Sequence, residues 1–164
     1  MDICYVIGDA TQPQGTGARI IVHICNDLGR WGKGFVLALS SRWAEREARY
    51  RAWSRGDAEV PFALGQVQFV AVGPALWVAN VLGQHGIRQA GAVPPIRYDA
   101  VRAGLAKVAQ FAQLHNATIH MPRIGTGLAG GNWESISQVI SEEICARGIA
   151  VTVYDLPADI ALAR

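Results

Sequence analysis

The stretch that decides the fold is "PRIGTGLAGGNW", residues 122–133. Four glycines occupy positions 125, 127, 130 and 131, after the apolar run "ATIHMP" and before a segment with the hydrophobic spacing of a helix. Glycine allows tight turns and lets a ligand come close to the backbone. The stretch therefore predicts a strand, a ligand-binding loop and a helix, in that order.

Strands and helices alternate outward from this loop. Period-two or continuous apolar runs predict strands at 3–7, 18–25, 67–72, 76–82, 117–122 and 149–156. Helical spacing predicts helices at 35–43, 45–53, 97–115 and 133–147, the last ended by Gly148. The turn signal Gly73-Pro74-Ala75 makes strands 67–72 and 76–82 a hairpin. We therefore expect a single α/β domain over 1–164, a three-layer sandwich whose mixed central sheet carries helices on both faces.

Composition excludes several classes of protein. About half of the 164 residues are hydrophobic, and the net charge is only +2 without a block of like charges, so neither a nucleic-acid groove nor a membrane surface is expected. The start "MDICYVIGDA" lacks a signal-peptide pattern, and we expect a cytoplasmic monomer. Cys4, Cys25 and Cys145 are expected to be buried free thiols, and no Cys/His spacing predicts a metal site or a cofactor.

The pattern "GTGLAG" also matches the dinucleotide-binding fingerprint G-x-G-x-x-G. That fingerprint normally opens a domain whose sheet continues after it, whereas only nine residues follow Asp155 at the end of the next strand. No Lys-Ser or Lys-Thr pair follows the glycines, which excludes a P-loop. We therefore expect neither of these nucleotide sites.

A second glycine-rich loop, "CNDLGRWGKGF" at 25–35, also joins a strand to a helix. Consecutive amides in such loops converge on anions, and the start of a helix adds partial positive charge. In parallel sheets, ligands bind at the carboxyl ends of the strands, where both loops would lie. Two adjacent loops would then grip a diphosphate, although the glycines could also serve only to make tight turns.

Four blocks of the chain together resemble the macrodomain family, the ADP-ribose-binding module. They are "GDA" at 8–10, "IIVHICNDLGRWGKGF" at 20–35, "MPRIGTGLAGGNWESI" at 121–136 and "VTVYDL" at 151–156. The chain is most similar to the branch that includes the terminal ADP-ribose glutamate hydrolases, the macrodomain of the chromatin remodeller called amplified in liver cancer 1, and the yeast ADP-ribose-1″-phosphate phosphatase. The resemblance implies that the ligand is ADP-ribose or an ADP-ribosylated macromolecule.

The resemblance also assigns binding roles. Asp9 matches the acid that accepts a hydrogen bond from the adenine amino group, and Asn26 matches the residue that contacts the distal ribose. Tyr154 stands where a side chain near the adenine is found. The full set implied for ligand binding is Asp9, Ala10, Cys25, Asn26, Gly32, Gly34, Phe35, Pro122, Ile124, Gly125, Thr126, Gly127, Leu128, Ala129, Gly130 and Tyr154.

Catalytic roles transfer less directly. Gln84 stands near the place of the lysine that the glutamate hydrolases use, and Ala129 or Gly130 stands near the place of their aspartate. The candidates for catalysis are therefore Asn26, Asp27 and His23, the last at the place of the phosphatase histidine. We expect hydrolysis of mono-ADP-ribose from Glu or Asp side chains or from a related O-linked substrate. A non-enzymatic ADP-ribose reader and an ADP-ribose-1″-phosphate phosphatase remain the alternatives. Further polar candidates are Lys33, Arg88 and Arg97.

Overall fold

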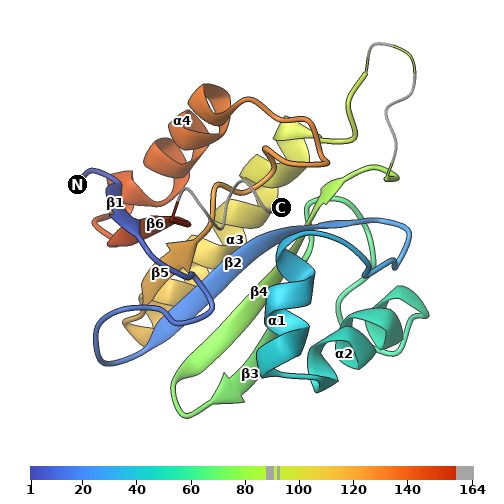
Figure 1. Ribbon diagram of the computed structural model, residues 1–164, viewed down its shortest axis with the longest axis horizontal. Helices are drawn as coiled ribbons and strands as arrows, with labels where there is room; N and C mark the ends of the chain where they lie inside the picture. The colour runs from blue at the N-terminus through green and yellow to red at the C-terminus, as the bar shows by residue number, and fades with distance from the viewer. Residues whose placement is uncertain (88–90, 92, 158–164) are drawn as a thin grey trace.

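The computed structural model describes residues 1–87, 91 and 93–157, and its centre is one six-stranded sheet (Figure 1). The strand order is β1-β6-β5-β2-β4-β3, and only β3 runs antiparallel to its neighbour. The strands are β1 Cys4–Ile7, β2 Arg19–Asn26, β3 Val67–Gly73, β4 Leu76–Gln84, β5 Thr118–Met121 and β6 Val151–Asp155. The helices are α1 Phe35–Arg42, α2 Glu45–Ser54, α3 Tyr98–His115, α4 Trp133–Glu143 and a 3₁₀ helix, η1, Cys145–Arg147.

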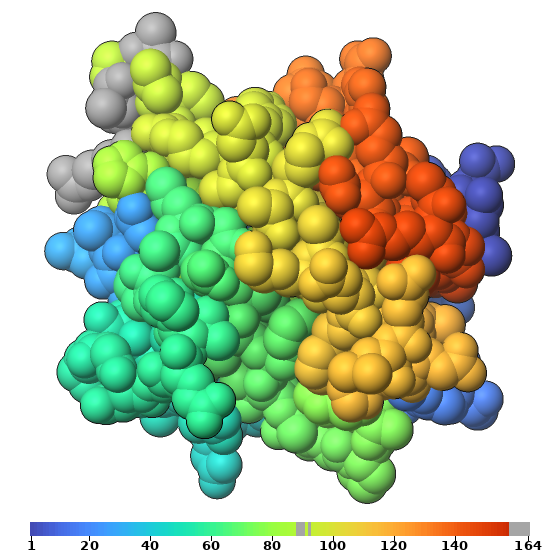
Figure 2. Space-filling view, turned by 180° about the vertical axis from the view of Figure 1, so that it is seen from behind, coloured from blue at the N-terminus to red at the C-terminus, as the bar shows by residue number. Residues whose placement is uncertain are grey.

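Successive side chains of β2 point to opposite faces of the sheet, which explains why both faces are covered. Ile20 and Val22 belong to the apolar core under α3 and α4, whereas Ile21 and Cys25 belong to the core under α1 and α2. Figure 1 shows the two helix pairs on opposite sides of the sheet. Seen from behind, α3 and α4 lie side by side and form part of the surface (Figure 2). The predicted three-layer α/β sandwich is confirmed.

The parallel strands also place the loops that follow them at one edge of the sheet. β2 pairs in parallel with both β4 and β5, so Asn26 ends opposite Gln84, while β5 ends at Met121, one residue after the pair of His120 with Ile21, and its loop continues along β2. The loops that begin after these residues are therefore neighbours, although they lie far apart in the sequence. This edge is where ligands bind in open α/β sheets.

Most predicted elements are confirmed to within two residues, and two expectations are wrong. The last predicted helix, 133–147, instead ends at Glu143 and tightens into the 3₁₀ turn η1, a common way for a helix to end. Gly148 follows in the left-handed conformation, with φ 76°, as expected of a C′ residue. Cys4 is exposed on the edge strand β1, whereas Cys25 and Cys145 are buried free thiols.

No helix among the described residues is long and apolar enough to cross a membrane. Residues 158–164 at the end of the chain lie outside the described residues.

Candidate functional site

A cleft of about 860 Å³ opens at the carboxyl ends of β2, β4 and β5. The loop after β2 forms one wall and the loop after β5 forms the other, so both glycine-rich loops face the same space. Within the described part of the chain, four basic residues and no Asp or Glu line this cleft: Arg30, Lys33, Arg51 and Arg123. The lining therefore favours a ligand that carries negative charge.

A smaller cavity of about 210 Å³ adjoins the main cleft. Phe35, Pro122 and Arg123 line both, so the two cavities share a wall. Asp9 and Tyr154 lie in the smaller cavity. One ligand could thus extend from the Asp9 carboxylate to the space between the two glycine loops.

The glycines in these loops serve two different purposes. A Cβ atom at Gly32, Gly34 or Gly127 would meet no atom within 4 Å, so these glycines leave open space beside the cleft. Gly34 is also the N-cap of α1, with φ 77° and no side-chain cap, so the first amides of the helix keep no partner within the helix. Because residues 34–36 line the cleft, this helix start presents an anion-binding terminus to it.

Other glycines of the second loop are required by packing. A Cβ at Gly125, where φ is 72°, would lie 2.8 Å from the Ile96 side chain. A Cβ at Gly130 would lie 2.8 Å from Pro94, and Gly130 is not among the residues that line the cleft. These positions hold the loop against the segment before α3.

Asp9 is held in place by its neighbours. Its Oδ1 accepts hydrogen bonds from the Thr11 amide at 2.8 Å and the Thr11 hydroxyl at 2.7 Å, while Oδ2 lies 3.6 Å from an Arg42 nitrogen. Partial burial opposes ionisation of Asp9, but the Thr11 hydrogen bonds and the Arg42 charge outweigh it and lower the pKa. Asp9 is therefore an ionised acceptor, with Oδ1 held by Thr11 and Oδ2 facing the Arg42 guanidinium.

Arg123 lies where the two cavities meet. It donates two hydrogen bonds to the Asp155 carboxylate, at 2.7 and 2.9 Å, which lower the pKa of Asp155. The guanidinium also lies over the rings of Tyr5 and Trp133, 5.1 and 5.2 Å from their centroids. Contacts from three elements therefore fix one cation of the cleft in a defined position.

His23 lies in the wall of the cleft with only 2% of its surface exposed. Its Nε2 bonds the side-chain oxygen of Asn80, which already accepts from Arg46, so Nε2 carries the proton and Nδ1 is the acceptor, 3.9 Å from the Cys25 Sγ. Burial lowers the pKa of His23 to about 3. His23 is therefore neutral at physiological pH and a weak base.

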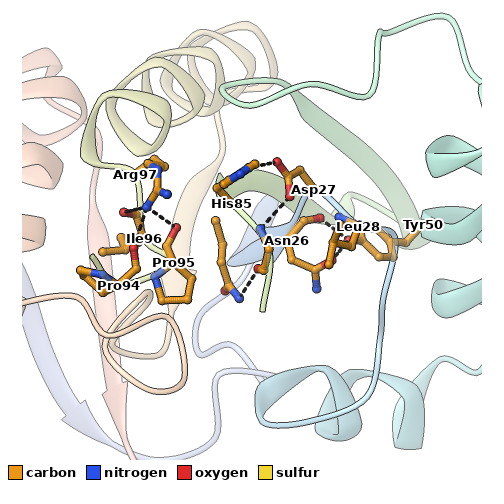
Figure 3. Close-up of polar contacts among 11 residues, drawn as sticks. Asn26, Asp27, Leu28, Tyr50, His85, Pro94, Pro95, Ile96 and Arg97 are labelled. Carbon is orange, nitrogen blue, oxygen red and sulfur yellow. Dashed lines mark hydrogen bonds and ion pairs between the residues drawn. The ribbon is translucent and has the colours of Figure 1, made fainter. Parts of the chain in front are cut away.

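The loop after β2 is tied together by Asn26 and Asp27 (Figure 3). The Asn26 side chain accepts from the Leu28 and Arg30 amides and donates to the Arg30 carbonyl, so it closes its own turn. Asp27 bonds the Gly86 amide at 2.8 Å and lies 2.7 Å from His85 Nδ1. Asp27 thus links the loop after β2 to the segment after β4.

No family model matches the chain. A structure of a protein of unknown function from Bacteroides thetaiotaomicron has a TM-score of 0.91 and 57% identity, over 95% of this chain and 99% of that one. A macrodomain protein from Streptomyces coelicolor has a TM-score of 0.83 and 52% identity, over 94% of this chain and 99% of that one. This chain belongs to the macrodomain family.

Two more distant matches of this macrodomain are much longer than it. The mouse (Mus musculus) chromodomain-helicase-DNA-binding protein 1-like is 33% identical over 94% of this chain, which spans only 18% of that protein. DarTG from Thermosipho africanus, solved in complex with ADP-ribose, shares the fold at 14% identity and a TM-score of 0.67, over 85% of this chain and 38% of DarTG.

The macrodomain brings nearly all the predicted ligand residues to the two cavities. The exception is Gly130, which lies outside both linings, and the predicted catalytic Asp27 also lies outside them. The main cleft contains Cys25, Asn26, Gly32, Gly34, Phe35, Pro122, Ile124, Gly125, Thr126, Gly127, Leu128, Ala129 and the proposed catalytic His23, and the smaller cavity contains Asp9, Ala10 and Tyr154. Their roles toward a ligand stay predictions.

Several residues of the site were missed or misjudged from the sequence. Arg123 lies in the glycine-rich stretch 122–133, so its position in the sequence could have indicated a role in the cleft. Nothing in the sequence marks Arg51 on α2 as a cleft residue. Arg97, treated as a polar contact or a solvated arginine, instead donates to the carbonyls of Pro94, Pro95 and Ile96 (Figure 3). Arg88 lies outside the described residues.

Proposed function

We propose that this macrodomain binds ADP-ribose, with the adenine in the Asp9 cavity and the diphosphate and distal ribose between the glycine loops. The observation that carries the proposal is the pair of facing glycine loops over a cleft lined by four cations and, within the described residues, by no carboxylate. In the smaller cavity, which adjoins the cleft, the ionised Asp9 carboxylate supplies an acceptor for the adenine amino group. The complex of DarTG with ADP-ribose supports the same class of ligand, since DarTG shares the fold.

We further propose hydrolysis of the bond between the distal ribose and a Glu or Asp side chain. In this reaction the C1″–O bond breaks through an oxocarbenium-like state, and the carboxylate leaves with the electron pair. Water then adds to C1″, and its proton passes to a phosphate oxygen of the ligand and on to solvent. The products are ADP-ribose and the free side chain.

The residues of the cleft are suited to assist rather than to carry this proton transfer. A carboxylate leaving group needs no general acid, and the basic lining stabilises its developing charge. His23 is too weak a base at neutral pH, and Asp27 is bonded to Gly86 and His85 outside the lining. Asp27 is therefore proposed as a residue that positions the Asn26 loop, not as the base.

A reader of ADP-ribose is the second candidate. The observation that favours it is the same lack of a carboxylate in the described lining, since a protein that only binds its ligand needs no base. Binding is common to both candidates, and turnover separates them.

Binding is tested by calorimetric titration with ADP-ribose of the wild type and of Asp9→Asn. The substitution keeps the oxygen that Thr11 holds but turns the second oxygen, which faces Arg42, into an amide donor, which should weaken binding roughly tenfold to a hundredfold. Asp57→Asn, which changes an exposed carboxylate, is the matched control and should leave the affinity unchanged. If the wild type does not bind, the proposed function is refuted.

Turnover is tested by measuring the release of ADP-ribose from a protein mono-ADP-ribosylated on glutamate. Release that depends on Asn26 and not on His23 would agree with the proposed roles. Binding without release would identify a reader. Phosphate release from ADP-ribose 1″-phosphate would identify the phosphatase instead.

A further inference from the structure

Helix α2 carries a buried arginine whose charge is not paired. Arg46 is 1% exposed, and within the described part of the chain its guanidinium makes one hydrogen bond, from Nη2 to the Asn80 side-chain oxygen at 2.9 Å. Its Nε and Nη1 have no hydrogen-bond partner, and no carboxylate lies within ion-pair distance in the described ranges 1–87, 91 and 93–157. An unpaired buried cation is costly to the fold, so its presence calls for a reason.

The position of Arg46 suggests that reason. Asn80 accepts hydrogen bonds from both Arg46 and His23, and His23 and Cys25 line the main cleft. Burial lowers the pKa of Arg46 only to about 10, so the side chain stays charged at neutral pH. Burial is the larger effect at both neighbours, lowering the pKa of His23 and raising that of Cys25, and the nearby Arg46 charge acts on both groups, where it lowers the pKa. A permanent positive charge therefore stands directly behind one wall of the cleft.

We propose that Arg46 is a buried charge behind the cleft, which stabilises the diphosphate of the ligand electrostatically through the wall formed by His23 and Cys25. The identity of the anion rests on the proposed function. Exposed cations such as Lys33 are screened by salt over about 8 Å, whereas a buried charge acts through a medium of low dielectric constant. A bound diphosphate would in turn compensate the charge that the fold leaves unpaired.

Two readouts distinguish this role from a structural one. Arg46→Met keeps the length and packing of the side chain but removes the charge, so the unliganded protein should unfold at the same temperature or a higher one. Its affinity for ADP-ribose should fall roughly fivefold to twentyfold. Adenosine, which lacks the diphosphate, should compete for the site equally well in the variant and in the wild type.

The control variants address charge and location. Arg46→Lys keeps the charge and should bind ADP-ribose nearly as well as the wild type. Arg49→Met removes a charge from the exposed side of the same helix, and its small effect should vanish at high salt, whereas that of Arg46→Met should persist. Calorimetry at two salt concentrations, with thermal unfolding of each variant, measures all of these quantities.

Several outcomes would overturn the proposal. Unchanged ADP-ribose affinity in Arg46→Met would exclude an electrostatic role, and equal losses for ADP-ribose and adenosine with a lower unfolding temperature would show a structural one. If Arg46→Met does not fold, Arg46→Lys decides the question. An Arg46→Lys variant that folds and yet binds ADP-ribose weakly would exclude the electrostatic role, because it keeps the charge. If the wild type fails to bind ADP-ribose, the proposed function falls. Inorganic pyrophosphate then serves as the probe, and a loss of its binding in Arg46→Met would still support Arg46, whereas no binding even to the wild type would refute both.

Discussion

The substitution Gly131→Ala should destabilise the protein through a single backbone contact. The Gly131 amide donates to the Gly125 carbonyl oxygen at 2.7 Å, and this bond closes the second glycine loop. An added Cβ would lie 2.4 Å from that same oxygen and 2.9 Å from the Ile136 side chain. Since the nearest atom belongs to the backbone, no side-chain rotation relieves the clash, and the loop must open. A lost hydrogen bond of about 1 kcal/mol and overpacking of roughly 1–3 kcal/mol together predict a loss of about 2–4 kcal/mol.

Thermal unfolding followed by circular dichroism measures this loss. For a domain of this size it corresponds to a drop of roughly 5–15 °C in Tm. The matched control is Gly127→Ala in the same loop, where the new Cβ meets no atom within 4 Å, and its stability should stay within about 0.5 kcal/mol of the wild type. A stability of Gly131→Ala within that same margin would refute the reasoning, as would an equal loss in Gly127→Ala.

Three further predictions concern pH, the Asn26 turn and the Arg123 cation. Burial holds the pKa of His23 at about 3 and that of His120 at about 4, below the unfolded value of about 6.5. The unfolded chain therefore binds more protons between these values, and stability should fall by roughly 2 kcal/mol per histidine from pH 7 to pH 5. Urea midpoints against pH measure this, and His120→Gln should flatten the slope. Asn26→Ala, which opens the turn, should cost about 1–3 kcal/mol in the same assay. Arg123→Lys should weaken ADP-ribose binding in calorimetry about threefold to tenfold, because lysine cannot form the paired hydrogen bonds to Asp155.

The order and type of the elements could be predicted because hydrophobic periodicity reports directly which faces are buried. The continuous apolar run at 18–25 correctly predicted the strand β2, whose two faces are both covered, and Gly73-Pro74-Ala75 correctly predicted the hairpin. The point where α4 tightens into η1 could not be predicted, because Cys145 is as compatible with an α-helix as with a 3₁₀ turn. Such choices depend on packing rather than on local propensity.

The site could be located from the sequence but not described in detail. Glycines 125, 127, 130 and 131 look alike in the sequence, yet only the structure separates those that leave space in the cleft from those that Ile96 and Pro94 contact. Arg46 lies among other charged residues in "EREARYRAW", which is typical of a solvated helix. Its burial depends on Asn80, 34 positions away, and no local pattern carries that information.

The charge pattern of the cleft limits the bonds that it could cut. A cleft with cations and, within the described residues, no carboxylate can stabilise a leaving anion but offers no carboxylic acid that would protonate it. A Glu or Asp carboxylate leaves readily as an anion, because its conjugate acid has a pKa near 4, whereas a serine alkoxide needs a proton. Release of ADP-ribose from a serine-linked substrate should therefore be at least about a hundredfold slower than from a glutamate-linked one. Both rates can be measured on matched peptides with the wild-type protein. Equal rates would require an acid in the site and would contradict this account of the chemistry, even if binding of ADP-ribose were tight.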